Sequence, residues 1–107
     1  MTFKQPLKTL SGVALLLSSS AAFAHFPLMH CVFKGDNIEC EAGYSDGSKA
    51  VNSKVSMYDY DDNLVAKATT DKRSIATFKK TSGDFYIVFD SGHESPVEVD
   101  GVEITDK

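Results

Sequence analysis

Residues 30–41 read HCVFKGDNIECE, and this stretch predicts a β-hairpin. The dipeptide Gly35-Asp36 is typical of a two-residue hairpin loop, and apolar and polar residues alternate on either side of it. A loop at this position gives the pairs Lys34–Asn37, Phe33–Ile38, Val32–Glu39, Cys31–Cys40 and His30–Glu41. Counted from a hydrogen-bonded first pair, the two cysteines form a non-hydrogen-bonded pair with Cα atoms about 4.5 Å apart. A disulfide can bridge that distance.

The rest of the chain after this hairpin has a period of two, which is the period of β-strands. Turn signals separate the short alternating runs, and no stretch shows a helical period. We therefore predict an all-β fold, a small antiparallel β-sandwich of about seven strands with one disulfide-clamped hairpin. Asp100-Gly101 is interpreted as a second hairpin turn. The apolar positions of the runs are Val55 and Met57; Leu64, Ala66 and Ala68; Ala76 and Phe78; Phe85, Ile87 and Phe89; Val97 and Val99; and Val102 and Ile104.

The first 24 residues have the order of a secretory signal peptide. Lysines without acids come first, an apolar run from Leu10 to Leu17 follows, and Ala22-Phe23-Ala24 ends the segment. The apolar run is much shorter than the roughly 20 residues of a membrane-spanning helix. We predict cleavage after Ala24, a single domain over residues 25–107, and a periplasmic location, with secretion as the alternative.

The exported part is acidic. Of the chain's 11 basic residues Lys4 and Lys8 lie in the signal peptide, which leaves 9 basic against 15 acidic residues and a net charge of −6. Such a surface repels phosphate backbones and anionic lipid heads and attracts cations. We expect neither nucleic acid as a partner nor stable membrane insertion after cleavage.

Cys31 and Cys40 are the only cysteines, and both lie in the exported part. In an oxidising compartment the two thiols form a disulfide, which would stabilise so small a domain by roughly 2–3 kcal/mol. A two-thiolate metal site is the alternative. It would require reduced thiols in that compartment.

Cleavage after Ala24 makes His25 the first residue of the mature chain. Its α-amine and its imidazole then lie on one residue and can chelate a divalent transition metal, which displaces the amine proton near neutral pH. Pro27 has no backbone N–H, so a square-planar site built from successive amide nitrogens and a third-position histidine is excluded. A metal at this terminus is therefore bound by the amine and imidazole of His25, completed by another histidine.

The other candidate ligands are His30, His93, Asp90 and Glu41. His30 faces Glu41 in the predicted hairpin, and His93 follows Asp90 in a loop after the most apolar run. Imidazole, amine and carboxylate groups suit copper, nickel, cobalt or zinc, and copper binds most tightly in vitro. Each histidine taken alone also has an ordinary explanation: His30 as an exposed strand residue, His93 as a loop residue and His25 as a chain terminus.

Two further patterns are weaker. Residues 43–47, GYSDG, match G-x-S-x-G, but the nucleophile elbow requires a strand-to-helix turn in a larger α/β sheet, so we predict a glycine-flanked loop. Residues 59–63, DYDDN, begin like a calcium loop. Leu64 occupies the glycine position and Thr70 the glutamate position, so we predict a β-turn.

Residues 54–99 carry strand motifs, including VSMYD at 55–59 and DFYIVFD at 84–90, that resemble the transthyretin-like or carboxypeptidase-regulatory-like β-sandwich. The start HFPL at 25–28 together with Ser91-Gly92-His93 resembles small periplasmic domains associated with nickel and cobalt uptake. The chain is also similar to CopC-type periplasmic copper-binding proteins, which bind copper(II) through an N-terminal histidine and a later Asp and His. Asp90 and His93 match those later positions in type, although their spacing is wider. The resemblances to the nickel- and cobalt-uptake domains and to the CopC type imply a metal-binding role, and neither of them implies catalysis.

The sequence thus predicts a periplasmic protein, not an enzyme, that stores, delivers or takes up a transition metal, with a membrane metal transporter or another periplasmic protein as partner. The alternative is a structural or protein-interaction module with incidental histidines.

Overall fold

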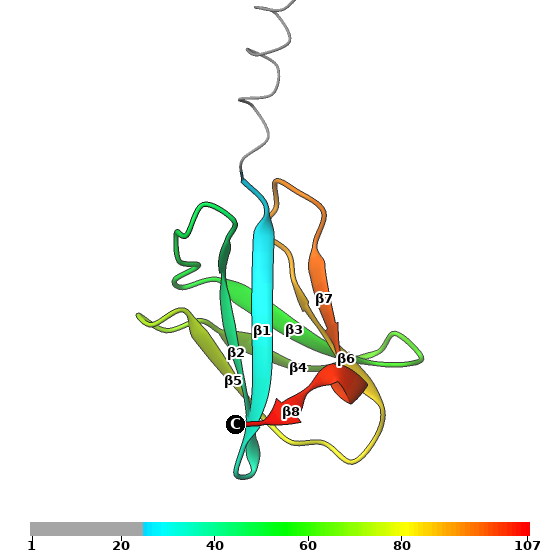
Figure 1. Cartoon of the computed structure of the whole chain (residues 1–107). Coiled ribbons are helices and arrows are strands. Elements are labelled where there is room, and N and C mark those ends of the chain that lie inside the picture. The colour runs from blue at the N-terminus through cyan, green and yellow to red at the C-terminus, as the bar shows by residue number, and fades with distance from the viewer. Residues whose placement is uncertain (1–24) are drawn as a thin grey trace, which may run out of the picture.

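The computed structural model describes residues 25–107, and the predicted signal peptide, residues 1–24, lies outside them. The described chain forms eight strands in two four-stranded sheets, with the orders β5-β2-β1-β8 and β4-β3-β6-β7 (Figure 1). The strands are β1 (Pro27–Lys34), β2 (Asn37–Tyr44), β3 (Lys54–Asp59), β4 (Leu64–Thr69), β5 (Ile75–Lys79), β6 (Phe85–Phe89), β7 (Val97–Asp100) and β8 (Thr105–Asp106). The predicted all-β sandwich is confirmed.

The hairpin of β1 and β2 has the predicted register, from Lys34–Asn37 through Cys31–Cys40 to His30–Glu41. Gly35 has a φ of 60°, a left-handed conformation that favours glycine in a tight turn. A disulfide joins Cys31 and Cys40, whose Cα atoms are 4.0 Å apart. Both cysteines are buried, so the side chains one residue away along each strand point outward.

The core lies between the sheets and contains alternate residues of both. Strands β1 to β7 contribute alternate side chains to this core or pack them against it, as a period of two requires, whereas both residues of β8 are exposed. The cluster of buried apolar residues consists of Cys31, Ile38, Cys40, Ala42, Ala50, Val55, Met57, Ala76, Phe78, Phe85, Ile87, Phe89 and Ile104.

The predicted hairpin at Asp100-Gly101 is wrong. Residues Gly101–Glu103 form a short 3-10 helix, η1, and the chain then crosses to the other sheet, where β8 pairs in parallel with β1. A hairpin would have kept both strands in one sheet and left Ile104 on it. Instead Ile104 is buried in the core, whereas Val102 is 78% exposed on η1. The local turn signal was correct for Asp100, whose side chain accepts a hydrogen bond from the Val102 N–H, but tertiary packing decides the direction of the chain.

The run at β4 follows its predicted face only in part. Ala66 and Ala68 pack against the core, but Leu64 is 48% exposed. The register between β3 and β4 shifts between Met57 and Tyr58, and this irregularity turns the first residue of β4 away from the core.

Candidate functional site

His25 lies two residues before β1, at one end of the sandwich, and its imidazole packs on an aromatic ring. The ring stacks on Tyr44 of β2, with centroids 4.6 Å apart and planes inclined by 15°. The Tyr44 ring in turn packs edge-to-face with the ring of the core residue Phe89, with the two ring centroids 6.0 Å apart. The imidazole therefore rests on a ring that the core itself holds in place, although half of the His25 side chain is exposed.

The last two residues of β2 and the connection that follows, which together we call the 43–49 loop, are hydrogen-bonded to the residue before β1. The Phe26 N–H donates to Ser45 Oγ at 2.9 Å, and the Ser45 N–H donates to the Phe26 carbonyl at 2.8 Å. Within the loop, the Gly47 N–H donates to the Tyr44 carbonyl at 2.9 Å, and the φ of Gly47 is 91°. These contacts fix the loop directly beside His25.

Asp46, in this loop, is the charged neighbour of His25. Its Oδ2 atom lies 3.7 Å from His25 Nε2. Its other oxygen, Oδ1, accepts hydrogen bonds from the Ser48 hydroxyl at 2.7 Å and from the Ser48 N–H at 3.0 Å. These two bonds hold the pKa of the Asp46 carboxyl below its ordinary value, so the group is ionised at neutral pH.

The two ring nitrogens of His25 therefore have different surroundings. An amine and an imidazole of the same residue can share a metal only through Nδ1, because Nε2 lies on the far side of the ring. The Asp46 carboxylate lies on the side of that far nitrogen, 3.7 Å away, where its charge can orient the ring and raise the basicity of Nδ1. Asp46 therefore lies beside His25 on the side of Nε2, away from Nδ1.

Asp46 was not among the predicted site residues, although the sequence carries a signal for it. The register of the hairpin, continued outward, places Pro27 opposite Tyr44, and the structure has this pair. The residues before Pro27 must then lie beside those after Tyr44. An Asp two residues before a Ser is typical of a local turn in which the carboxylate accepts backbone hydrogen bonds.

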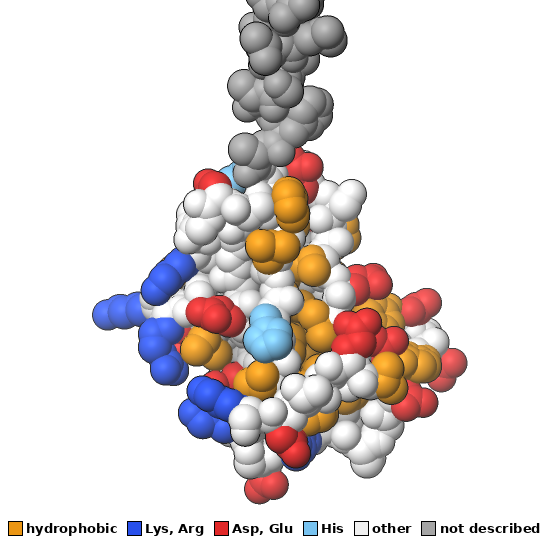
Figure 2. Space-filling model, in the orientation of Figure 1, with side chains coloured by type: hydrophobic (Ala, Val, Ile, Leu, Met, Phe, Trp, Pro, Cys, Tyr) orange, Lys and Arg blue, Asp and Glu red, His pale blue; other side chains and the backbone are white. Residues whose placement is uncertain are grey.

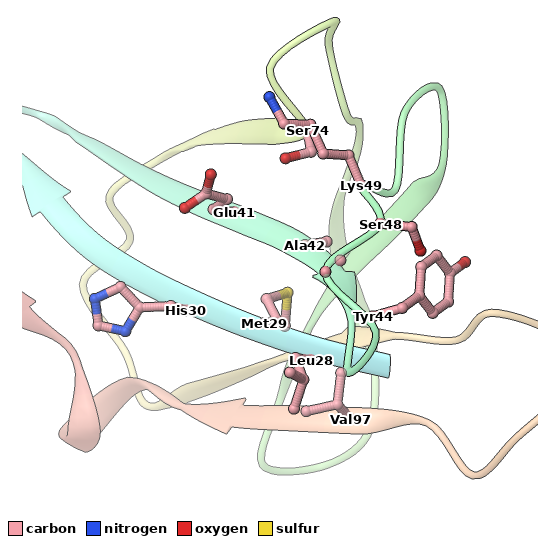
Figure 3. A pocket seen from close by; sticks show the side chains of 12 residues that line it. Leu28, Met29, His30, Glu41, Ala42, Tyr44, Ser48, Lys49, Ser74 and Val97 are labelled. Atoms are coloured by element: carbon pink, nitrogen blue, oxygen red, sulfur yellow. The ribbon is translucent and has the colours of Figure 1, made fainter. Parts of the chain in front are cut away.

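His30 and Glu41 face each other across β1 and β2, as predicted, with both side chains exposed on the outer face of their sheet. They line an open cleft of about 390 Å³ together with Leu28, Lys49, Ser74 and Val97. In Figure 3 the His30 ring lies at one end of this cleft and Tyr44, the residue under His25, at the other. Five residues of extended chain span on the order of 15 Å, so His30 and Glu41 do not share a ligand shell with His25.

His93 and Asp90 lie in the connection between β6 and β7. The Asp90 carboxylate accepts a hydrogen bond from the Gly92 N–H at 2.8 Å and so shapes its own loop. The connection reaches the same end of the sandwich as the start of β1 (Figure 1). Of the predicted ligands beyond His25, these two are therefore the ones at its end of the molecule.

Across residues 25–107, no three His, Cys, Asp or Glu side chains converge in an arrangement that would hold a metal ion. Nor does the described part of the chain contain a helix long and apolar enough to cross a membrane. Comparisons with protein-family models, curated proteins and solved structures find no match for this chain.

Proposed function

We propose that the mature chain is a periplasmic protein that binds a divalent transition metal through the amine and Nδ1 of His25. The metal is copper(II), nickel or cobalt, and the function is storage, delivery or uptake without catalysis. A membrane metal transporter or another periplasmic protein receives or supplies the ion. His93 and Asp90, in the β6–β7 connection, supply further ligands when that loop closes on the terminus.

One observation carries the proposal. His25 is packed on Tyr44 and faces the Asp46 carboxylate with Nε2, which leaves Nδ1 for a ligand bond. Metal-bound histidines usually give their second ring N–H to a carboxylate. The Asp46 carboxylate lies on that side of the His25 ring, 3.7 Å from Nε2. An exposed chain terminus without a role would need neither the stacked ring nor the carboxylate.

The chelate can be tested by acetylating the α-amine of His25. We compare the chain that begins at His25 with the same chain acetylated at this amine, by competitive titration with copper(II) and with nickel. Acetylation removes the amine nitrogen as a ligand and breaks the chelate, so the affinity of the acetylated chain should fall by about 100-fold. Equal affinity of the two chains would contradict the terminal chelate.

The ligand set beyond His25 can be tested with His93→Ala and His30→Ala in the chain that begins at His25. The first variant should weaken copper(II) binding, because His93 lies in a loop at the same end of the sandwich. The second should leave the affinity unchanged and serves as the matched control. A loss confined to the His30 variant would move the site to the outer face of β1 and β2.

A second candidate function is a protein-interaction module, and the exposure of Tyr60 and Val102 favours it. That surface lies on η1 and the β3–β4 turn and does not use the histidines.

A further inference from the structure

The charges of the molecule are segregated. Residues 81–106 contain seven acidic residues and no lysine or arginine, whereas residues 63–80 contain five basic residues and one acidic residue. Figure 2 shows most of the lysine and arginine side chains on the left of the molecule, with a few acidic ones near them, and most of the acidic side chains, with apolar ones among them, on the right. The two sides are electrostatically complementary, so one copy can attract the opposite side of another.

The acidic side contains a cavity of about 150 Å³ lined by Tyr60, Gly83, Asp84, Phe85, Gly101 and Val102. Two of the residues that line it are large apolar residues with high exposure to solvent: 52% of the surface of Tyr60 and 78% of that of Val102 is exposed. Apolar and aromatic groups surrounded by charges are typical of interaction surfaces.

Two features keep this cavity open and charged. A Cβ atom at Gly101 would lie 2.8 Å from the Phe85 ring, so only glycine allows η1 to approach this closely. The Tyr60 hydroxyl donates to Asp100 Oδ1 at 2.6 Å, which fixes the ring that forms one wall. That hydrogen bond is the main reason that the pKa of Tyr60 is raised to about 12, with partial desolvation and the charges of Asp100 and Asp84 adding to it.

An aromatic wall beside a carboxylate suits a guanidinium group, which stacks on the ring and pairs with the acid. The chain has a single arginine, Arg73, in the turn between β4 and β5 on the basic side. Its side chain is 73% exposed, and its one carboxylate contact, to Asp71, is 3.5 Å long. An exposed ion pair of this kind is worth little, so Arg73 is available to another partner.

We propose that the Tyr60–Val102 cavity binds Arg73 of a second copy of this chain. The guanidinium stacks on Tyr60 and pairs with Asp84, and the remaining lysines of one copy face the acidic side of the other. The contact is heterologous, so copies associate head to tail and each added copy leaves one free cavity and one free arginine. It does not involve His25 and holds whether or not the chain binds metal.

The first test is sedimentation of the mature chain at rising concentration in low salt. The contact is small and exposed, so we expect a dissociation constant on the order of 1 mM and loss of association when salt rises to about 0.5 M. Arg73→Ala should weaken association at least tenfold, and Arg73→Lys should weaken it less, because it keeps the charge but not the planar stack. Lys72→Ala, which removes a charge from the same turn, is the matched control and should have a small effect.

The second test mixes two variants. Arg73→Ala keeps the cavity and lacks the arginine, whereas Asp84→Lys keeps the arginine and lacks the acid. Each should be monomeric alone, and their mixture should form dimers that grow no further. A mixture that stays monomeric, or a mature chain that stays monomeric at about 1 mM in low salt, overturns the proposal. One further outcome also overturns the proposal: the chain stays monomeric, but free arginine methyl ester shifts the resonances of Tyr60 and Val102. The cavity would then bind a guanidinium group of another protein and not that of a second copy.

Discussion

The Cys31–Cys40 hairpin and the 43–49 loop are adjacent in the chain but differ in what holds them. The hairpin is covalently closed, and both cysteines lie in the core with at most 4% of their surface exposed. The loop is exposed and is held by hydrogen bonds to Phe26 and within itself. The hairpin therefore contributes stability, whereas the loop contributes the surroundings of His25. Variants in the two regions should separate stability from metal affinity.

The largest effect on stability is expected from the double variant Cys31→Ala with Cys40→Ala. Loss of the cross-link in this short loop should lower the free energy of unfolding by about 2–3 kcal/mol. Copper(II) affinity should stay unchanged while the chain remains folded, because neither sulfur lies near His25. Urea unfolding and metal titration of the same sample measure both quantities. A loss of copper(II) affinity in parallel with the loss of stability would show that the hairpin also supports the metal site.

Gly43→Ala tests the point where the hairpin passes into the loop. A Cβ atom at residue 43 would lie 2.9 Å from the Ser48 carbonyl oxygen, so the loop must move. We expect a loss of about 1–2 kcal/mol in stability and a severalfold loss of copper(II) affinity, because Asp46 moves with the loop. Gly83→Ala is the matched control, since nothing lies within 4 Å of its Cβ position. Equal behaviour of the two variants would show that the loop geometry does not matter.

Asp46→Asn should change affinity without changing stability. The amide is nearly the size of the carboxylate but cannot carry its charge, so the orientation and basicity of the His25 ring are reduced. Loss of such a partner typically weakens metal binding by 10-fold or more. Asp61→Asn, an exposed change in a distant turn, is the control. Unchanged copper(II) affinity in the Asp46 variant would show that Asp46 does not contribute to metal binding by His25.

The smallest effect concerns pH and belongs to the scaffold. The Tyr86 hydroxyl donates to Asp62 at 2.7 Å, and this bond raises the pKa of Tyr86 to about 12. A pKa raised on folding contributes stability that is complete below the unfolded value of about 10 and is lost as the pH rises from there through about 12. Tyr86→Phe should therefore flatten the alkaline decline in unfolding midpoint relative to the unchanged chain. An identical decline in both proteins would contradict this assignment.

The parts of the fold that local pattern controls could be predicted from the sequence. The hairpin register follows from Gly35-Asp36 and the alternation around it, and the remaining strands follow from their period of two. The crossing after Asp100 could not, because it depends on the close approach of Gly101 to Phe85, a contact between residues distant in the chain. The pattern of the C-terminal residues is the same for a hairpin and for a crossing.

The same distinction applies to the candidate site. The pair His30–Glu41 follows from the hairpin register, whereas the contact between His25 and Asp46 depends on how the loop after Tyr44 folds back. Side-chain types alone suggested carboxylates near histidines in sequence, such as Asp90. The carboxylate beside His25 is 21 residues away along the chain, and only the pairing of β1 with β2 brings it there.

The central claim is that the 43–49 loop acts on metal binding through the terminal chelate of His25. The measurement that tests it most directly is copper(II) titration of four chains: the mature chain and its Asp46→Asn variant, each with a free and with an acetylated α-amine at His25. Asp46→Asn should weaken binding about tenfold in the chains with a free amine and have no effect in the acetylated chains, where the chelate is already lost. An equal loss in both backgrounds would contradict the account, because Asp46 would then act on a metal bound elsewhere.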